Sequence, residues 1–270
     1  LDTLKTRDNV HLIIGPSLGH EGMAAVDWGA RNPDVPMLIG YSAPEDITMR
    51  KATNSVIRPG WTGAQVIFNF GQYCAKDLGY KKIIIVGQDY SYPWDQAAGF
   101  IRGFLENGGE KVERIWHPVE AVDFSSIMAK LMSMSKEYDA VLNNSGGAQV
   151  IGFFKQWKQF GLDKVYPQIL GQANVPIVSM LTELGDSALG VYSSLHYYDG
   201  NPSGANKKFR DSFKKEYGHY PDVIAVQGYD AVHVAFKAMK AINGQVDDPK
   251  KFIAALRPVK MSVDESPRGP

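Results

Sequence analysis

Short runs of β-branched and aliphatic residues alternate along the chain with longer segments whose apolar residues recur every three or four positions. The short runs predict β-strands, and the longer segments predict amphipathic helices. Strands are expected at residues 11–14, 37–39, 55–57, 82–86, 113–116, 140–142, 168–170 and 190–194. Helices are expected at 64–78, 94–107, 125–135, 149–160, 207–217 and 224–242, and residues 1–5 are typical of the end of a further helix.

This alternation of strand and helix predicts an α/β fold. The run Ile-Ile-Ile-Val at residues 83–86 is apolar on both faces, as strands are when helices cover both sides of a parallel sheet. From Asn206 onward two helices follow each other without a strong strand between them. We therefore predict parallel sheets flanked by helices, in two Rossmann-like lobes joined by strands rather than by one flexible tether.

Composition narrows the class of partner. With 270 residues and 44% apolar content, the chain exceeds the usual size of a single domain. Its 29 basic and 29 acidic residues leave no net charge, which disfavours nucleic acid or an anionic membrane and favours a small molecule. No apolar run approaches the roughly 18 to 20 residues of a membrane span. The single cysteine, Cys74, excludes an internal disulfide, and its amphipathic surroundings favour a buried structural thiol.

One motif points toward catalysis. Residues 15–19, Gly-Pro-Ser-Leu-Gly, follow a predicted strand and match the G-x-S-x-G turn that exposes the nucleophile of α/β-hydrolases. No HGGG-like segment supplies the second oxyanion donor, which disfavours an enzyme. The competing interpretation is a helix N-terminus whose N–H groups, together with the Ser17 hydroxyl, meet a ligand anion.

Cofactor and metal motifs are absent from the sequence. No G-x-G-x-x-G follows a strand, no Gly-Lys-Ser/Thr occurs, and the six histidines share no spacing typical of metal ligands. We therefore expect no cofactor and no metal. His20 lies in the first strand-to-helix turn, where a ligand contact and a structural role are about equally expected.

Polar and aromatic residues gather after the carboxyl ends of predicted strands, where an open parallel sheet places its binding crevice. Four loops share this character, at residues 41–43, 88–94, 143–146 and 171–174. A single aromatic residue in such a loop can also be ordinary packing under a turn. The recurrence of the pattern in four loops favours a binding site.

Five stretches, in this order and spacing, carry a family resemblance. They are Ile-Ile-Gly-Pro-Ser at 13–17, Val-Ile-Arg-Pro at 56–59, the turn with Asp89 and Tyr92, Val-Asp-Phe-Ser at 122–125 and Gly-Tyr-Asp-Ala-Val at 228–232. From about Val10 to its end the chain resembles the type I periplasmic binding proteins, in particular the family that includes the leucine/isoleucine/valine-binding protein.

The resemblance implies two lobes that close over a ligand and present the closed form to a membrane permease. Lobe one would hold residues 1–58 and 198–258, lobe two would hold 59–197, and 259–270 would cross between them. The resemblance also implies a further βα segment before residue 1 and further strands after residues 266–270. It implies an exported protein with a signal peptide, periplasmic or anchored outside the cytoplasm, and we expect a monomer.

The resemblance also indicates site residues. In amino-acid-binding members the ligand carboxylate is held by two strand-to-helix turns, which fall here on residues 18–20 and 41–43, with the usual serine and threonine replaced. A tyrosine of the site falls on Tyr92, and the acidic residue that pairs with the ligand ammonium falls on Ala173. The predicted ligand-binding residues are Ser17, Leu18, Gly19, His20, Tyr41, Ser42, Ala43, Tyr90, Tyr92, Trp94, Ser145, Gly146, Ala173 and Ile224.

The alanine at position 173 decides the predicted ligand. An enclosed ammonium without a partner would cost several kcal/mol, and each 1.4 kcal/mol is about tenfold in affinity. We therefore expect a carboxylate without an amino group, and the rings near the crevice favour an aromatic acid of the benzoate or phenylpropanoid kind. Asp89 or Asp95 could replace the lost carboxylate, so a branched-chain or other amino acid stays an alternative ligand.

Two functions other than transport stay open on the sequence. A serine hydrolase would use Ser17, although we predict that the protein is not an enzyme. A sensor or regulator would use the same two-lobed clamp to detect a ligand rather than to deliver it.

Overall fold

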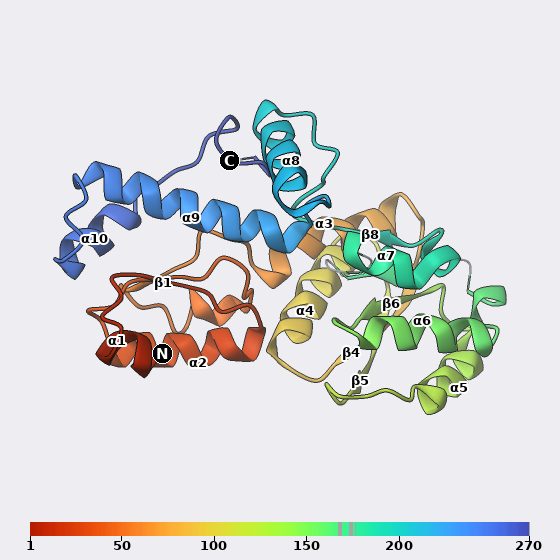
Figure 1. The fold of residues 1–270 in the computed structure, drawn as a ribbon. Coiled ribbons are helices and arrows are strands. Elements are labelled where there is room, and N and C mark those ends of the chain that lie inside the picture. Colours follow the sequence, from red (N-terminus) through yellow and green to blue (C-terminus); the bar gives the residue numbers. More distant parts are fainter. Residues whose placement is uncertain (167–168, 173–174, 176, 270) are drawn as a thin grey trace. The chain divides into compact units, whose positions relative to one another are not determined.

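A computed structural model describes residues 1–166, 169–172, 175 and 177–269. The chain forms two compact units (Figure 1). Unit 1 comprises Leu1–Thr62 together with His196–Pro270, and unit 2 comprises Gly63–Leu195. Unit 2 is one continuous stretch of chain, whereas unit 1 needs the segments on both sides of it.

Unit 2 is built on a five-stranded parallel sheet in the order β5-β4-β6-β7-β8. The strands are β4 (Lys82–Gln88), β5 (Lys111–His117), β6 (Ala140–Asn144), β7 (Ile169–Gly171) and β8 (Tyr192–Ser193). The helices are α3 (Gly63–Lys76), α4 (Ser91–Leu105), α5 (Ser125–Met134), α6 (Gln149–Gln159) and α7 (Val178–Leu184), with 3-10 turns at Leu162–Lys164 and Gly185–Ala188.

The sheet of unit 2 is buried on both faces because its central strands carry consecutive apolar residues, Ile83–Val86 in β4 and Ala140–Leu142 in β6. Side chains alternate between the two faces of a strand, so β4 contributes residues to two separate hydrophobic cores. One core includes Ile84, Val86, Val141, Phe124 and Phe153. The other includes Ile83, Ile85, Leu142, Phe70 and Phe100. Each fully buried side chain of this size contributes about 1.5–3 kcal/mol, which makes β4 the centre of the unit's stability.

Helices α3 and α4 pack with their backbones in contact, and glycine makes this possible. A Cβ added at Gly103 would lie 2.0 Å from the Phe68 carbonyl oxygen, and one at Gly99 would lie 2.5 Å from that of Ala64. From the other side, a Cβ at Gly71 would lie 2.3 Å from the Phe100 carbonyl oxygen. Side chains at these positions would force the two helices apart.

Cys74 lies on the inner face of α3 and is fully buried. Burial raises the pKa of its thiol to about 12, so the reactive thiolate is suppressed at neutral pH. The predicted structural role of this cysteine is confirmed. We expect a thiol reagent at about pH 8 to label Cys74 only as unit 2 unfolds, so labelling and the loss of far-UV circular dichroism should share one urea midpoint. Rapid labelling of the folded protein would contradict this assignment.

Unit 1 holds a smaller parallel sheet in the order β1-β2-β3. The strands are β1 (Ile13–Ile14), β2 (Met37–Leu38) and β3 (Val56–Ile57). The helices are α1 (Asp2–Thr6), α2 (Gly19–Arg31), α8 (Gly204–Tyr217), α9 (Val223–Ala241) and α10 (Pro249–Leu256), with a 3-10 turn at Glu45–Ile47. Adjacent residues of β2 again serve opposite faces, since Met37 packs with Val26 and Trp28 of α2, and Leu38 packs with Val234 of α9 and Phe252 of α10.

The ends of the late helices follow from their flanking residues. Asp222 caps α9 by accepting from the Ile224 and Ala225 backbone N–H groups at 2.9 and 3.0 Å. Asp248 caps α10 in the same way, and Pro249 occupies the first helical position, where no backbone N–H is needed. Gly218, with φ of 79°, ends α8 in the left-handed conformation that glycine tolerates.

A buried ion pair ties the last residues of unit 1 to α9. Arg268 Nε lies 2.6 Å from Asp230 Oδ2, which also accepts from Ser266 Oγ at 2.9 Å. The second arm of the guanidinium donates to the Pro59 carbonyl at 2.5 Å. Asp230 is only 1% exposed, so these partners take the place of the water that would otherwise solvate its carboxyl group.

The predicted fold class is confirmed, and the predicted strands and helices match observed elements. Paired segments in unit 1 are shorter than expected, because only two residues of each predicted strand enter the ladder. The strand expected at 190–194 likewise pairs only through Tyr192 and Ser193. Residue 168 lies outside the described residues, and the strand expected there begins at Ile169. Helices α7 and α10 were not predicted, and α2 was expected only as a helix after the turn at residues 15–19, without bounds.

Candidate functional site

The carboxyl ends of the unit 2 strands carry buried polar side chains at one edge of the sheet. Gln88 ends β4, His117 ends β5, Ser145 follows β6 and Gln172 follows β7. All four are at most 4% exposed. The parallel register places Gln88 directly beside His117, so these residues form one layer.

His117 and Ser145 form a hydrogen-bonded pair in this layer. His117 Nδ1 lies 2.8 Å from the Pro118 carbonyl oxygen, which can only accept, so Nδ1 carries the ring proton. His117 Nε2 therefore accepts from Ser145 Oγ, 2.8 Å away. Burial lowers the pKa of His117, an effect that the Pro118 carbonyl partly opposes. The ring is thus held in its neutral form at neutral pH.

Gln88 fixes the turn that follows β6. Its Nε2 donates to the Val119 carbonyl at 3.1 Å, and its Oε1 accepts from the Gly146 backbone N–H at 2.9 Å. The Ser145 N–H is held by Asn143 Oδ1 at 3.0 Å. Two consecutive amides of this turn are therefore oriented by side chains of the sheet.

Gln172 links the same turn to the loop after β4. Its Nε2 donates to the Ser145 carbonyl at 2.9 Å, and its Oε1 accepts from the Tyr92 hydroxyl at 3.0 Å. Tyr92 is 8% exposed, so its ring is largely part of the packed interior and its hydroxyl is engaged. Two predicted site residues, Tyr92 and Ser145, are thereby joined through a residue that sequence reasoning did not single out.

Three predicted aromatic residues come from the start of α4. The rings of Tyr90 and Tyr92 lie 6.4 Å apart in a tilted arrangement. Tyr90 is half-buried, and burial raises the pKa of its phenol to about 12, so it stays a neutral hydrogen-bonding group. Trp94 is 48% exposed, and its indole N–H donates to Asp89 Oδ1 at 3.0 Å. Ala173, the last predicted residue of this unit, lies outside the described residues.

In unit 1 the structure brings two predicted turns together. Ser42 Oγ donates to the Leu18 carbonyl at 3.0 Å, and Glu21 Oε2 accepts from the Leu18 backbone N–H at 3.1 Å. A Cβ at Gly22 would lie 2.0 Å from Ser42 Oγ, so glycine is required for this approach. Ser42 and Ala43 are buried, whereas Ser17 and His20 are exposed and Gly19 begins α2. Among the described residues, no histidine is hydrogen-bonded to Ser17.

Tyr41 belongs to a row of rings that sequence reasoning missed. Its ring meets Trp61 edge-on, with centroids 6.0 Å apart, and Trp61 stacks on His196 at 4.1 Å. Burial lowers the pKa of His196 to about 3, with a smaller contribution from the charge of Arg268. Ile224, the remaining predicted residue, is 43% exposed on the first turn of α9, and no hydrogen bond or ring contact joins it to the other predicted residues.

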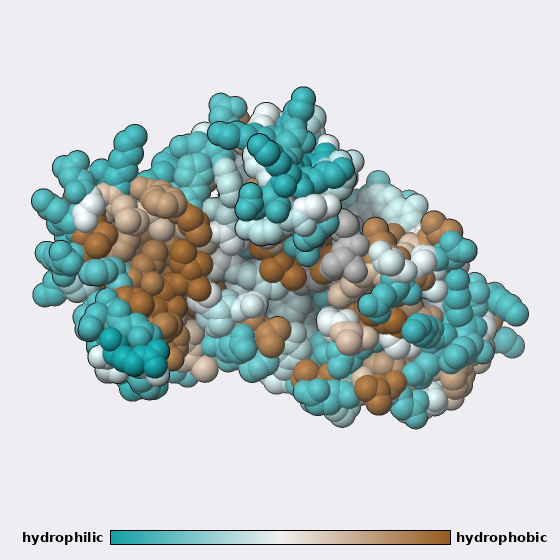
Figure 2. Space-filling model, viewed as in Figure 1, coloured by the Kyte–Doolittle hydropathy of each residue, from teal (hydrophilic) through white to brown (hydrophobic). Residues whose placement is uncertain are grey.

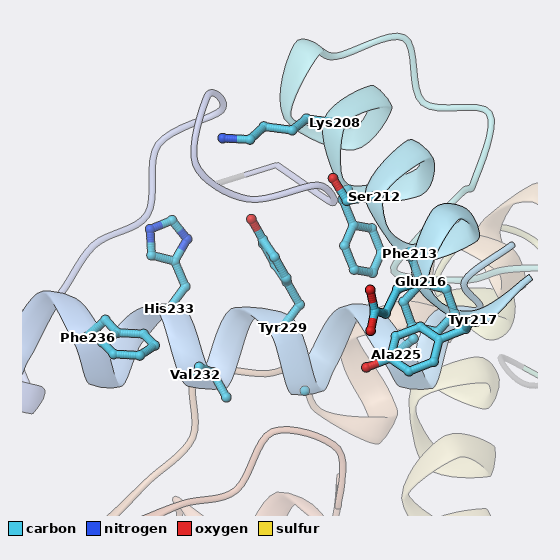
Figure 3. A pocket seen from close by; sticks show the side chains of 12 residues that line it. Lys208, Ser212, Phe213, Glu216, Tyr217, Ala225, Tyr229, Val232, His233 and Phe236 are labelled. Carbon is cyan, nitrogen blue, oxygen red and sulfur yellow. The ribbon is translucent and has the colours of Figure 1, made fainter.

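A groove lies between α8 and α9 of unit 1 (Figure 3). This groove has a volume of about 680 Å³, and Figure 3 shows Tyr229 and Phe213 projecting into it from the two helices. None of the predicted site residues lines it. Figure 2 shows apolar surface on unit 1. The exposed apolar side chains of this unit include Phe236 and Val232 of α9, which also line the groove, and Ile14 of β1.

The described residues offer little for metal chemistry or membrane insertion. No three histidine, cysteine or carboxylate side chains among them are grouped as a metal site requires. No helix in the described ranges combines the length and apolar content needed to cross a membrane.

Two α/β units with parallel sheets, one of which carries a layer of neutral polar and aromatic side chains at its strand ends, are typical of two-domain ligand-binding proteins. The family model described as "Periplasmic binding protein" matches residues 1–270, and the chain belongs to this family. It is therefore a solute-binding protein of an ABC transporter system, as the sequence resemblance predicted.

Similar proteins of known sequence or structure agree with this assignment. Leu/Ile/Val-binding protein homolog 6 of Brucella melitensis is 31% identical over 269 residues, which cover 99% of this chain and 67% of the relative. The chain thus spans about two thirds of the length of these relatives. A solute-binding protein from R. palustris in complex with benzoate has a TM-score of 0.89 and 25% identity, over 99% of this chain and 71% of that one. One from Rhodopseudomonas palustris BisB5 in complex with 3,4-dihydroxybenzoic acid has a TM-score of 0.88 and 32% identity, with coverage of 99% and 71%.

Proposed function

We propose that this protein captures a small aromatic carboxylate outside the cytoplasm and delivers it to a membrane permease. The observation that carries the proposal is the neutral strand-end layer of unit 2. Its hydrogen-bonding groups are two glutamines, a serine, a neutral histidine and tyrosine hydroxyls. Such a layer suits a ring and its uncharged substituents, since aromatic walls and a few polar groups are what small-molecule sites provide.

The residue at position 173 supports an acid without an amino group. Position 173 carries alanine where the resemblance places the carboxylate that pairs with a ligand ammonium. Asp89, one of the two candidates to replace it, accepts the Trp94 indole N–H and is exposed. An ammonium enclosed without a partner would cost several kcal/mol. Proteins of similar fold and sequence that were solved with benzoate and 3,4-dihydroxybenzoic acid point to the same ligand class.

We further infer that units 1 and 2 are the two lobes that close over the ligand. The predicted residues of both units would then face one ligand, with residues 18–20 and 41–43 on the carboxylate side and residues 90–94 and 145–146 on the ring side. A monomer in the periplasm, or one anchored outside the cytoplasm, fits delivery to a permease.

A thermal-shift screen tests the ligand class. At a concentration of about 100 Kd, a ligand that binds only the folded protein stabilises it by about 2.7 kcal/mol, which raises Tm by about 5–10 °C. We expect shifts of this size from benzoate, hydroxybenzoates or cinnamates, and none from leucine, isoleucine or valine. Cyclohexanecarboxylate is the matched control that keeps the carboxylate and removes the aromatic ring.

A branched-chain amino acid is the second candidate ligand, because the curated relatives carry the name Leu/Ile/Val-binding protein homolog. Strong stabilisation by leucine with no response to any aromatic acid would establish this candidate and end the aromatic-acid proposal. Calorimetric titration with the best compound of the screen would then give the affinity and stoichiometry.

A further inference from the structure

We propose that His117 is a positioning residue of the ligand site, which holds the Ser145–Gly146 turn through the Ser145 hydroxyl and makes ligand affinity fall as this histidine becomes protonated. The inference rests on the proposed function, since it assumes that the strand ends of unit 2 receive the uncharged part of the ligand. It adds a residue and a form of regulation that neither the family resemblance nor the sequence motifs indicate.

The hydrogen bonds around the ring leave no place for a second proton. Nδ1 already donates to the Pro118 carbonyl at 2.8 Å, and Nε2 accepts from Ser145 Oγ at 2.8 Å. Protonation of Nε2 would turn this acceptor into a donor, so the Ser145 hydroxyl would have to rotate and lose its present partner. Ser145 is fully buried and His117 is 3% exposed, so water cannot readily take over either bond.

Protonation of His117 would also affect Gly146, a half-buried residue that lies where the ligand is proposed to bind. The Ser145 carbonyl accepts from Gln172, and the next amide, that of Gly146, donates to Gln88. Disturbing Ser145 therefore shifts the backbone on both sides of the peptide bond that presents Gly146. Tyr92 would be displaced as well, because its hydroxyl donates to the same Gln172 side chain.

Among the residues that the structure describes, no ion pair compensates for a charge on the His117 ring. Phe124, at the start of α5, meets it edge-on at 5.1 Å, and Ser145 and Pro118 are neutral. The charged groups on the surrounding segments are Asp89 beside β4 and Glu120 and Asp123 before α5, and all three are exposed. Burial lowers the pKa of His117, and the hydrogen bond to the Pro118 carbonyl partly opposes this shift.

The sign of the pH effect follows from that direction. Because the folded state lowers the pKa, the ring is neutral and supports ligand binding fully above the ordinary value of about 6.5. Ligand affinity falls as the pH drops through the lowered pKa of the folded protein. A ligand that covers the strand ends would desolvate the ring further and lower the pKa again. Each pKa unit by which the bound ligand lowers the pKa of His117 weakens binding at acid pH by about tenfold.

Calorimetric titration with benzoate between about pH 5 and pH 8 tests the proposal, because a carboxyl group stays mostly ionised in this range. We expect wild-type affinity to fall by about tenfold toward the acid end. His117→Gln places an amide oxygen where Nε2 accepts, but it cannot titrate; it should weaken binding by about threefold throughout and remove the pH dependence. His117→Ala should lose more affinity, and His219→Gln, at an exposed histidine of α8's terminus, should keep the wild-type profile.

The outcomes separate this inference from the proposed function. Binding at about pH 8 with an affinity that does not change with pH, or that rises on acidification because the ligand carboxylate faces the imidazole, would overturn the role of His117 and leave the proposed function standing. The role of His117 would also be overturned if the affinity of His117→Gln for benzoate still fell on acidification. No binding of any aromatic acid at about pH 8 would end both. Circular dichroism and melting of each variant would show that unit 2 is folded.

Discussion

Replacement of Gly103 by alanine should cost about 2–3 kcal/mol of folding free energy, although it adds a single methyl group to a helix. The new Cβ would lie 2.0 Å from the Phe68 carbonyl oxygen, a backbone atom that can move only if α3 and α4 separate. Overpacking of this kind typically costs about 1–3 kcal/mol, and a backbone obstacle places the substitution at the upper end. Urea unfolding monitored by circular dichroism would measure the change.

Gly152→Ala is the matched control for this substitution. Gly152 also lies inside a helix of unit 2, on α6, but its added Cβ would meet the Phe124 ring at 3.6 Å, an ordinary contact. Alanine there should be neutral or stabilise by about 0.5–1 kcal/mol, since glycine is a poor helix former. Equal effects at the two positions would show that α3 and α4 do not pack with their backbones in contact.

Removal of the Arg268 side chain should destabilise unit 1 by about 3–5 kcal/mol. Arg268→Ala leaves the Asp230 carboxylate, 1% exposed, with only the Ser266 hydroxyl as a hydrogen-bond partner in the described structure. Loss of one member of a buried ion pair carries this cost because the remaining charge stays desolvated. The Pro59 carbonyl loses a donor as well. Differential scanning calorimetry would record the effect as a lower Tm.

Two further variants test whether the stability lost in Arg268→Ala comes from the unpaired charge of Asp230. Arg50→Ala removes an arginine that pairs with Asp46 at 2.6 Å but is 83% exposed, and it should cost at most about 0.5 kcal/mol. Asp230→Asn in the Arg268→Ala background should restore part of the lost stability, because the unpaired charge is gone. If the double variant were no more stable than Arg268→Ala, the interpretation of a stranded carboxylate would fail.

Much of the fold could be predicted from the sequence because local pattern and final environment agree. The run at 83–86 is apolar at each position, and the structure buries it between helices on both faces of the sheet. The short α7 was missed because seven residues are too few to establish a helical period. Helix α10 was missed as well, although Asp248 and Pro249 form a capping signal at its start.

The candidate site was predicted only in outline. The loops after the strands were found, but Gln88, His117 and Gln172 were not identified as site residues, since each is a single polar residue at the end of an apolar run. His117 and Ser145 are 28 positions apart in sequence, and only the register of β5, β4 and β6 brings them together. Trp61 and His196 were missed for the same reason, because a stacked pair separated by half of the chain leaves no local signal in the sequence.

The way the chain threads through its two units also bears on how the protein is made. Residues 63–195 can complete their own core as soon as they leave the ribosome, whereas the first 62 residues must wait for helices α9 and α10 before β2 is covered on its second face. During synthesis the early segment therefore exposes Leu38 and Ile57 for the time needed to translate everything in between. We expect this amino-terminal stretch, rather than the larger sheet, to be what chaperones recognise on the nascent polypeptide.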